Sequence, residues 1–286
     1  MRVRQNAKKT GTSIIFGEVQ RGGTSDFLLS HPVFTADEAV RAFGAAGDKK
    51  RALKRLRYHV ANGRLRSVTH EVYAAIPPGV DADRFQPDRY LVAAAVRPDG
   101  VLAYHAALEL LGAAHSDWGV CSVLTAKPRA PVELGAARIE FLPHPHALRR
   151  RRAQMLGTRT VDRRGRSLRV TGPERTLLDG FRHPDRVGGL QELVESAAGF
   201  GVLDLALLRK LLETYGEKRL WAAAGWFLER HQQGFFVPPE YLASMAPHRP
   251  AAPRYLERGR RGGKLFSRWN LIVPPALASA AEPDEA

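Results

Sequence analysis

The alternation of apolar and polar positions predicts two short helices near the start of the chain. Residues 35–38, Thr-Ala-Asp-Glu, form a capping box, in which the threonine and glutamate side chains each bond the other's backbone amide. A second helix is predicted from Lys49 to Asn62, because its apolar side chains recur every three or four residues on one narrow face. Gly63 follows at the position where helices commonly end.

Two alternating segments, 65–68 and 71–74, follow the second helix and predict a hairpin. A capped helix, a tight turn at 44–48, a second helix and a hairpin are the parts of a winged helix-turn-helix, whose second helix enters the major groove of DNA. A helix of this length spans about 20 Å and fits a groove about 12 Å wide. We therefore expect a DNA-binding module at 22–80, with the apolar residues 14–16 as an extra strand ahead of it.

The rest of the chain mixes helical and β-type patterns. Apolar, β-rich runs predict strands at 118–125, 138–142, 169–171 and 269–273. Helical patterns predict helices at 104–111, from Pro173 onward, and at 190–198, 205–215 and 221–231. The Pro-rich stretch 77–88 is interpreted as a linker. The predicted fold is α+β, with the winged helix-turn-helix domain at 22–80 followed by a larger mixed α/β domain at 91–275.

Charge is concentrated in three segments of the chain. The 286 residues hold 44 Lys and Arg against 29 Asp and Glu, a formal net charge of +15. Segments 1–80, 149–169 and 249–268 carry net charges of +8, +8 and +6, which leaves the remainder at −7. Such an excess favours a polyanion, either nucleic acid or an anionic membrane surface. The helix at 49–62 has too few bulky apolar anchors for a membrane surface, so we expect DNA as the partner and no membrane.

The candidate DNA-contacting residues lie on the second helix and the adjacent hairpin. The first turn of such a helix commonly meets base edges, and arginines beside the hairpin hold phosphates. The set is Lys49, Lys50, Arg51, Lys54, Arg55, Arg57, Arg64, Arg66 and His70. A candidate second nucleic-acid surface comprises Arg149, Arg150, Arg151, Arg152, Arg163, Arg164 and Arg166, although a solvated loop rim explains the same arginines. The segment 249–268 poses the same choice.

Patterns for catalysis and metal binding are weak. A nucleotidyltransferase needs a Gly-Ser and a metal-binding Asp-x-Asp, but the chain has no Gly-Ser, and its one Asp-x-Asp, at 81–83, lies in the predicted linker. No glycine-rich phosphate loop is present. His144 and His146 flank a proline and are explained more simply by a loop than by a metal site. Cys121 is the single cysteine, which excludes a disulfide framework and a zinc ribbon. We expect no enzyme, no cofactor and no metal.

Several short motifs follow one another in a recognisable order after the predicted winged helix. They are Pro-Glu-Arg-Thr-Leu-Leu-Asp at 173–179, His-Pro-Asp at 183–185, Gly-Val-Leu-Asp at 201–204 and Arg-Trp-Asn-Leu-Ile-Val-Pro at 268–274. On these residues the chain resembles the AbiEi family, antitoxins of type IV abortive-infection toxin–antitoxin systems. The resemblance implies a cytoplasmic phage-defence protein whose winged helix binds inverted repeats in its own promoter and represses the operon. It also implies a C-terminal domain that counteracts a co-encoded nucleotidyltransferase-like toxin, without requiring direct contact.

Two other functions remain open at this point. One is a stand-alone transcriptional regulator whose larger domain senses a ligand. The other is a winged helix fused to a nuclease, for which Asp185 offers a first carboxylate and Glu217-Lys218-Arg219 only a near match to the required Glu-x-Lys.

Overall fold

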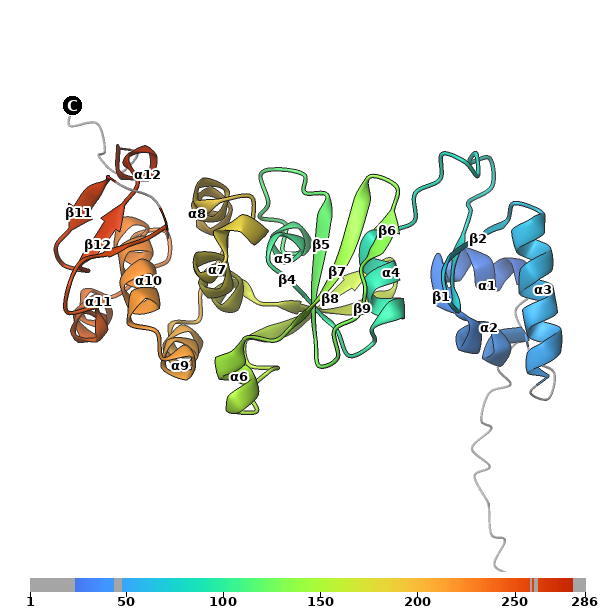
Figure 1. The fold of residues 1–286 in the computed structure, drawn as a ribbon, viewed down its shortest axis with the longest axis horizontal. Helices are drawn as coiled ribbons and strands as arrows, with labels where there is room; N and C mark the ends of the chain where they lie inside the picture. The colour runs from blue at the N-terminus through green and yellow to red at the C-terminus, as the bar shows by residue number, and fades with distance from the viewer. Residues whose placement is uncertain (1–23, 44–47, 258, 260–261, 280–286) are drawn as a thin grey trace, which may run out of the picture.

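The computed structural model describes residues 24–43, 48–257, 259 and 262–279 of the chain. Its elements lie in a row, with a small helical part and sheet at one end, a six-stranded sheet in the middle, and helices with a small sheet at the other end (Figure 1). The described residues form both helices and mixed sheets, which confirms the predicted α+β class. Residues 44–47 of the predicted turn at 44–48, and the predicted strand at 14–16, lie outside the described residues.

The N-terminal part is built as a winged helix. The predicted capping box forms: the Thr35 amide donates to Glu38 Oε2 at 2.7 Å, and the Glu38 amide donates to Thr35 Oγ1 at 3.2 Å. Asp48 also caps the second helix, where it accepts from the Arg51 amide at 3.1 Å. Gly63 takes a left-handed φ of 65° after the helix, as its position predicts. The elements are α1 (Thr24–Ser30), β1 (Val33–Thr35), α2 (Ala36–Phe43), α3 (Lys49–Ala61), β2 (Leu65–Thr69) and β3 (Val72–Ala75), and the antiparallel sheet has the order β1-β3-β2.

Both faces of this small sheet are buried. Successive side chains point to opposite faces, so Phe34 and Ala75 pack against the winged-helix core, whereas Val33 and Ala74 join the core of the middle sheet. Helix α4 (Arg89–Val96) covers that second face and contacts both β1 and β3. The winged helix is therefore packed onto the larger domain, and α3 lies on the side away from α4 (Figure 1).

The middle sheet has the strand order β6-β7-β5-β4-β9-β8. β5 and β7 run parallel, as do β4 and β9, whereas the remaining pairs are antiparallel. Alternate residues of β5 divide between two cores: Cys121 and Val123 face α4, and Leu124 joins the core around α7. The elements are β4 (Val101–Ala103), α5 (His105–Leu110), β5 (Val120–Thr125), β6 (Val132–Leu134), β7 (Ala137–Pro143), α6 (His146–Arg150), β8 (Thr158–Arg163), β9 (Arg166–Thr171) and α7 (Pro173–Arg182).

The C-terminal helices pack around aromatic side chains. Trp221, Trp226 and Phe227 are all buried, and Trp269 packs closely against Gly225. Asp204 caps α9, where it accepts from the Leu207 amide at 2.9 Å. The helices are α8 (Leu190–Ala198), α9 (Leu205–Tyr215), α10 (Lys218–Arg230), α11 (Pro239–Met245) and α12 (Pro275–Ser279), with short 3₁₀ turns at Pro184–Arg186 and Ala246–His248. The strands are β10 (Arg254–Tyr255), β11 (Lys264–Phe266) and β12 (Leu271–Val273).

Within the described ranges, no helix has both the length and the apolar character needed to cross a membrane.

Candidate nucleic-acid interface

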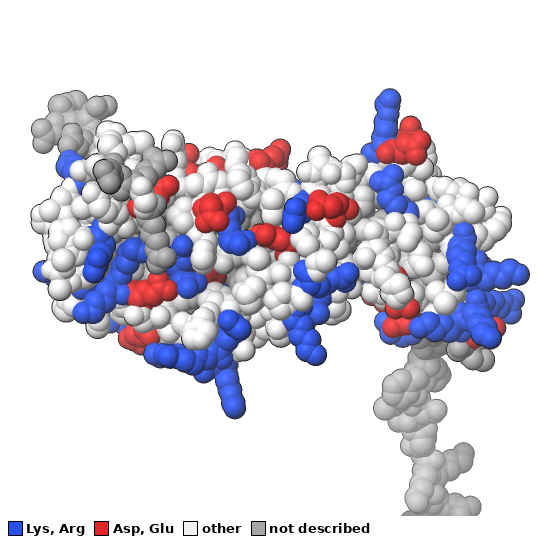
Figure 2. Space-filling model, viewed as in Figure 1, with Lys and Arg blue, Asp and Glu red and all other residues white. Residues whose placement is uncertain are grey.

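Helix α3 has one buried face and one strongly basic face. Ala52, Leu56 and His59 are buried against the winged-helix core. The opposite side is exposed, and Lys and Arg side chains gather over α3 in Figure 2. We call Lys50, Arg51, Lys54, Arg55 and Arg57 the basic face of α3; all five are exposed.

Lys49 differs from the residues of that face. Its ammonium group lies 3.7 Å from a carboxylate oxygen of Asp37 and 3.7 Å from one of Glu71. Both contacts are solvent-exposed and therefore weak, so Lys49 remains accessible, but part of its charge is offset within the protein.

The three remaining candidate DNA residues lie in different environments. Arg64 and His70 are exposed, His70 in the turn between β2 and β3. The Arg66 guanidinium instead donates to the backbone carbonyls of Ala82 and Phe85 in the linker. Arg66 thus ties the hairpin to the linker, and only part of its donor capacity remains for a phosphate.

The second set of arginines divides into two groups. Arg149 to Arg152 lie on α6 and the turn that follows it and are all exposed. Two others form ion pairs: Arg163 pairs with Asp88, the residue before α4, at 2.7 Å, and Arg166 pairs with Glu38 of the winged helix at 2.7 Å.

Arg163 also stacks over the Tyr90 ring, with its guanidinium carbon 4.7 Å from the ring centroid. Arg164, between these two paired arginines, is exposed at the tip of the β8–β9 hairpin. The hairpin therefore contacts the winged helix through Arg166 and the start of α4 through Arg163, and it leaves Arg164 facing solvent.

The motif at 173–179 forms a buried polar network inside the larger domain. Arg175 and Asp179 have fully buried side chains, and the Arg175 Nε lies 3.3 Å from Asp179 Oδ2. The Tyr215 hydroxyl donates to the other oxygen of Asp179 at 2.5 Å. Glu174 accepts from the Asp204 amide at 2.7 Å, at the start of α9. The motif therefore joins α7 to α9 and is closed to solvent.

Residues 100–230, which include this network, match the family model described as the AbiEi antitoxin C-terminal domain. Over these residues the chain is similar to the AbiEi antitoxin C-terminal domain. This finding confirms the resemblance drawn from the sequence motifs and supports an antitoxin role in a toxin–antitoxin system. No curated protein matches the chain. The crystal structure of the RV2827C protein from Mycobacterium tuberculosis is similar, with a TM-score of 0.58 and 20% identity over 90% of this chain and 93% of that one. At that identity, the likeness shows a common fold alone.

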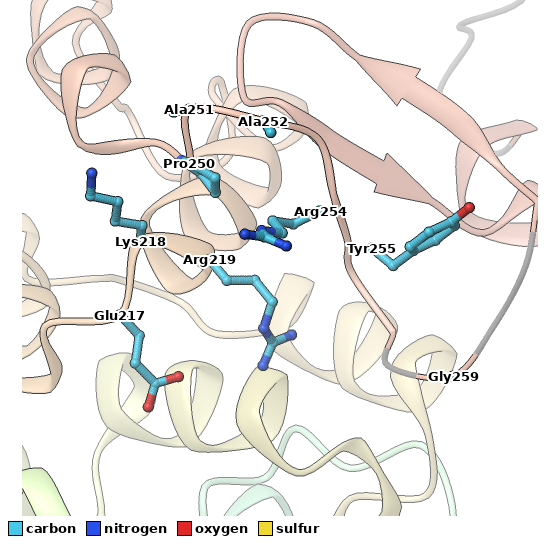
Figure 3. Close-up of a pocket in the computed structure, with 9 residues that line it drawn as sticks. All are labelled: Glu217, Lys218, Arg219, Pro250, Ala251, Ala252, Arg254, Tyr255 and Gly259. Atoms are coloured by element: carbon cyan, nitrogen blue, oxygen red, sulfur yellow. The ribbon is translucent and has the colours of Figure 1, made fainter.

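The basic segment 249–268 lies beyond the matched AbiEi range, beside a cavity of about 710 Å³ (Figure 3). Arg219 and Arg254 approach one another in this cavity from α10 and β10. Arg219 also donates to the carbonyls of Leu256 and Phe181, at 2.8 and 3.1 Å, so it joins the C-terminal part to α7. Glu217 pairs with Arg182 at 2.9 Å. Glu217 and Arg219 are thus both engaged by other groups of the protein.

The candidate metal ligands of the AbiEi domain do not converge. His144 is buried, whereas His146 is exposed at the start of α6. Across the part of the chain that the structure describes, no three or more His, Cys, Asp or Glu side chains are grouped closely enough to hold a metal ion. Cys121 is a buried free thiol of β5, and burial raises its pKa well above the usual range. Cys121 therefore behaves as a small apolar core residue.

Proposed function

We propose that this protein is a cytoplasmic, non-enzymatic antitoxin that binds DNA through its winged helix. On this proposal α3 enters the major groove at inverted repeats in the protein's own promoter and represses the operon. The AbiEi domain counteracts a co-encoded nucleotidyltransferase-like toxin. The observation that carries the proposal is the exposed basic face of α3, set on a winged helix that is packed onto an AbiEi antitoxin domain.

The packing of the winged helix favours this mode of binding. Because α4 covers one face of the small sheet, the side of the winged helix that carries α3 is the one left open to a duplex. Five exposed cations over a helix of 13 residues match the closely spaced phosphates that flank a groove. Arg149 to Arg152 and Arg164 are the residues we propose for a second contact with nucleic acid.

A mobility-shift assay on the upstream promoter tests DNA binding. If about six phosphates are neutralised, log K should fall with log salt at a slope near −5. Arg57→Ala should weaken binding on every sequence and reduce that slope by about 1. Arg138→Ala is the matched control, because Arg138 is an exposed arginine of the middle sheet. Absence of a salt-sensitive complex with the wild-type protein would rule out the repressor role.

Co-expression with the neighbouring toxin gene tests the antitoxin role separately. The full chain should restore growth, and Lys54→Ala/Arg57→Ala should still restore it while repression is lost, since both residues lie outside the AbiEi domain. Failure of the wild-type chain to restore growth refutes the antitoxin role. Mg²⁺-dependent cleavage of the promoter DNA would instead select a nuclease fusion.

A further inference from the structure

A second cavity, of about 550 Å³, opens in the larger domain between the loop after α6 and helix α9. Two of its lining residues, Ala126 and His144, directly follow β5 and β7. These strands are parallel neighbours, so their carboxyl ends meet at one edge of the sheet. Open α/β sheets commonly bind ligands at this edge. The volume also falls within the range of small-molecule sites.

The walls of this cavity combine positive charge with an apolar surface. Arg151, Arg152 and Lys210 supply three cations from two different elements. Its one acidic residue, Asp99, is engaged already, because it accepts from Arg97 at 2.8 Å and from Thr125 at 3.0 Å. The apolar part of the lining is provided by Ala126, Ala153, Met155 and Leu156. The cavity is therefore suited to a ligand with one anionic and one apolar end.

His144 lines the cavity with a largely buried ring. Its side chain is only 2% exposed, and its Nδ1 lies 3.5 Å from Arg175 Nη2. An arginine can only donate, so Nδ1 accepts and the ring proton belongs on Nε2. Desolvation and then the charge of Arg175 lower the pKa of His144 to about 4, which keeps the ring neutral at pH 7.

The loop that lines the cavity is anchored to the core. Arg175 Nη1 donates to the carbonyls of Gln154 and Leu156, at 2.6 and 3.1 Å. Arg152, at the edge of the same loop, has a left-handed φ of 55°, a conformation that a non-glycine residue rarely adopts and that surrounding structure must hold. The backbone of this loop is thus held in place before any ligand arrives, which reduces the entropic cost of binding.

We propose that this cavity binds a nucleoside phosphate. The base packs on the apolar wall, the phosphates lie against Arg151, Arg152 and Lys210, and His144 Nε2 donates a hydrogen bond to the ligand. This site is separate from the basic face of α3 but shares Arg151 and Arg152 with the proposed second contact for nucleic acid. The proposal therefore does not depend on DNA binding by α3 or on toxin neutralisation.

Isothermal titration calorimetry on the full chain tests the site, with ATP, adenosine and inorganic triphosphate as separate probes. One ATP should bind per chain, and adenosine and triphosphate should each bind at least tenfold more weakly, because each lacks one end of the ligand. Absence of ATP binding at millimolar concentration would overturn the proposal. Triphosphate that binds as tightly as ATP would overturn the nucleoside assignment.

Matched variants separate a built site from general attraction to a basic surface. Arg151→Ala and Lys210→Ala should each weaken ATP at least tenfold, whereas Arg150→Ala, the neighbouring arginine outside the lining, should change it less than twofold. Ala126→Trp should block the cavity without changing any charge. Thermal melting of each variant checks that it folds. If Arg150→Ala and Arg151→Ala weaken ATP binding equally, the attraction is a general effect of the basic surface and the site is refuted.

Discussion

The buried polar network of the motif at 173–179 leads to a strong prediction about stability. Arg175 and Asp179 are both fully buried, and Asp179 is the one carboxylate that pairs with Arg175 among the described residues. Tyr215 depends on the same carboxylate, and burial together with the charge of Asp179 raises the pKa of its hydroxyl well above the usual range. Asp179→Ala leaves a buried guanidinium without its counter-charge and a buried hydroxyl without its acceptor.

The expected loss is a large part of the total stability. Removing one partner of a buried ion pair costs about 3–5 kcal/mol, against roughly 5–15 kcal/mol for a whole domain. For a domain of about 150–250 residues, each 1 kcal/mol shifts the melting temperature by about 2–4 °C. Asp179→Ala should therefore lower the melting temperature by roughly 6–20 °C.

Urea unfolding of the full chain, followed by far-UV circular dichroism, measures this loss. Asp185→Ala is the matched control, because Asp185 is exposed on the 3₁₀ turn after α7 and its loss should cost less than about 0.5 kcal/mol. Arg175→Met/Asp179→Leu should recover part of the stability by removing both charges. The recovery stays partial because the Gln154 and Leu156 carbonyls lose their donor. If the free energies of unfolding of Asp179→Ala and Asp185→Ala differ by less than 1 kcal/mol, the structural role of the motif at 173–179 is refuted.

Two further predictions concern packing and the contact between the domains. A Cβ at Gly225 would lie 2.2 Å from the Trp269 ring, so Gly225→Ala should cost about 1–3 kcal/mol by overpacking, and an unchanged urea midpoint would contradict this packing. Burial acts to raise the pKa of Glu38, but the Thr35 amide and Arg166 outweigh it and lower that pKa below the usual 4.5. The ionised carboxylate therefore stabilises the folded protein fully above pH 4.5, and this stabilisation is lost as the pH falls through the lowered pKa. In urea titrations at a series of pH values, Glu38→Gln should lose less unfolding free energy on acidification than the wild type. Equal losses in the two proteins would refute this role of Glu38.

The local sequence by itself determined the position of those helices that have both a capping residue or other end signal and a regular apolar periodicity. The helices at 190–198 and 205–215 have the predicted bounds, and the capping box at 35–38 forms as expected, because caps and apolar periodicity act within a few residues. The charge segments were also evident without a structure. Exposed cations on the helix at 49–61 follow directly from its apolar stripe.

Tertiary structure alone decided which short segments pair and which charges remain available. The three-residue strands β1, β4 and β6 were not predicted, because so short a run is defined by its neighbours in the sheet and not by its own composition. Arg163 and Arg166 were grouped with the exposed arginines, yet they pair with Asp88 and Glu38, which lie 75 and 128 residues away in sequence. The sequence states where a charge is located along the chain, but only folding brings its counter-charge beside it.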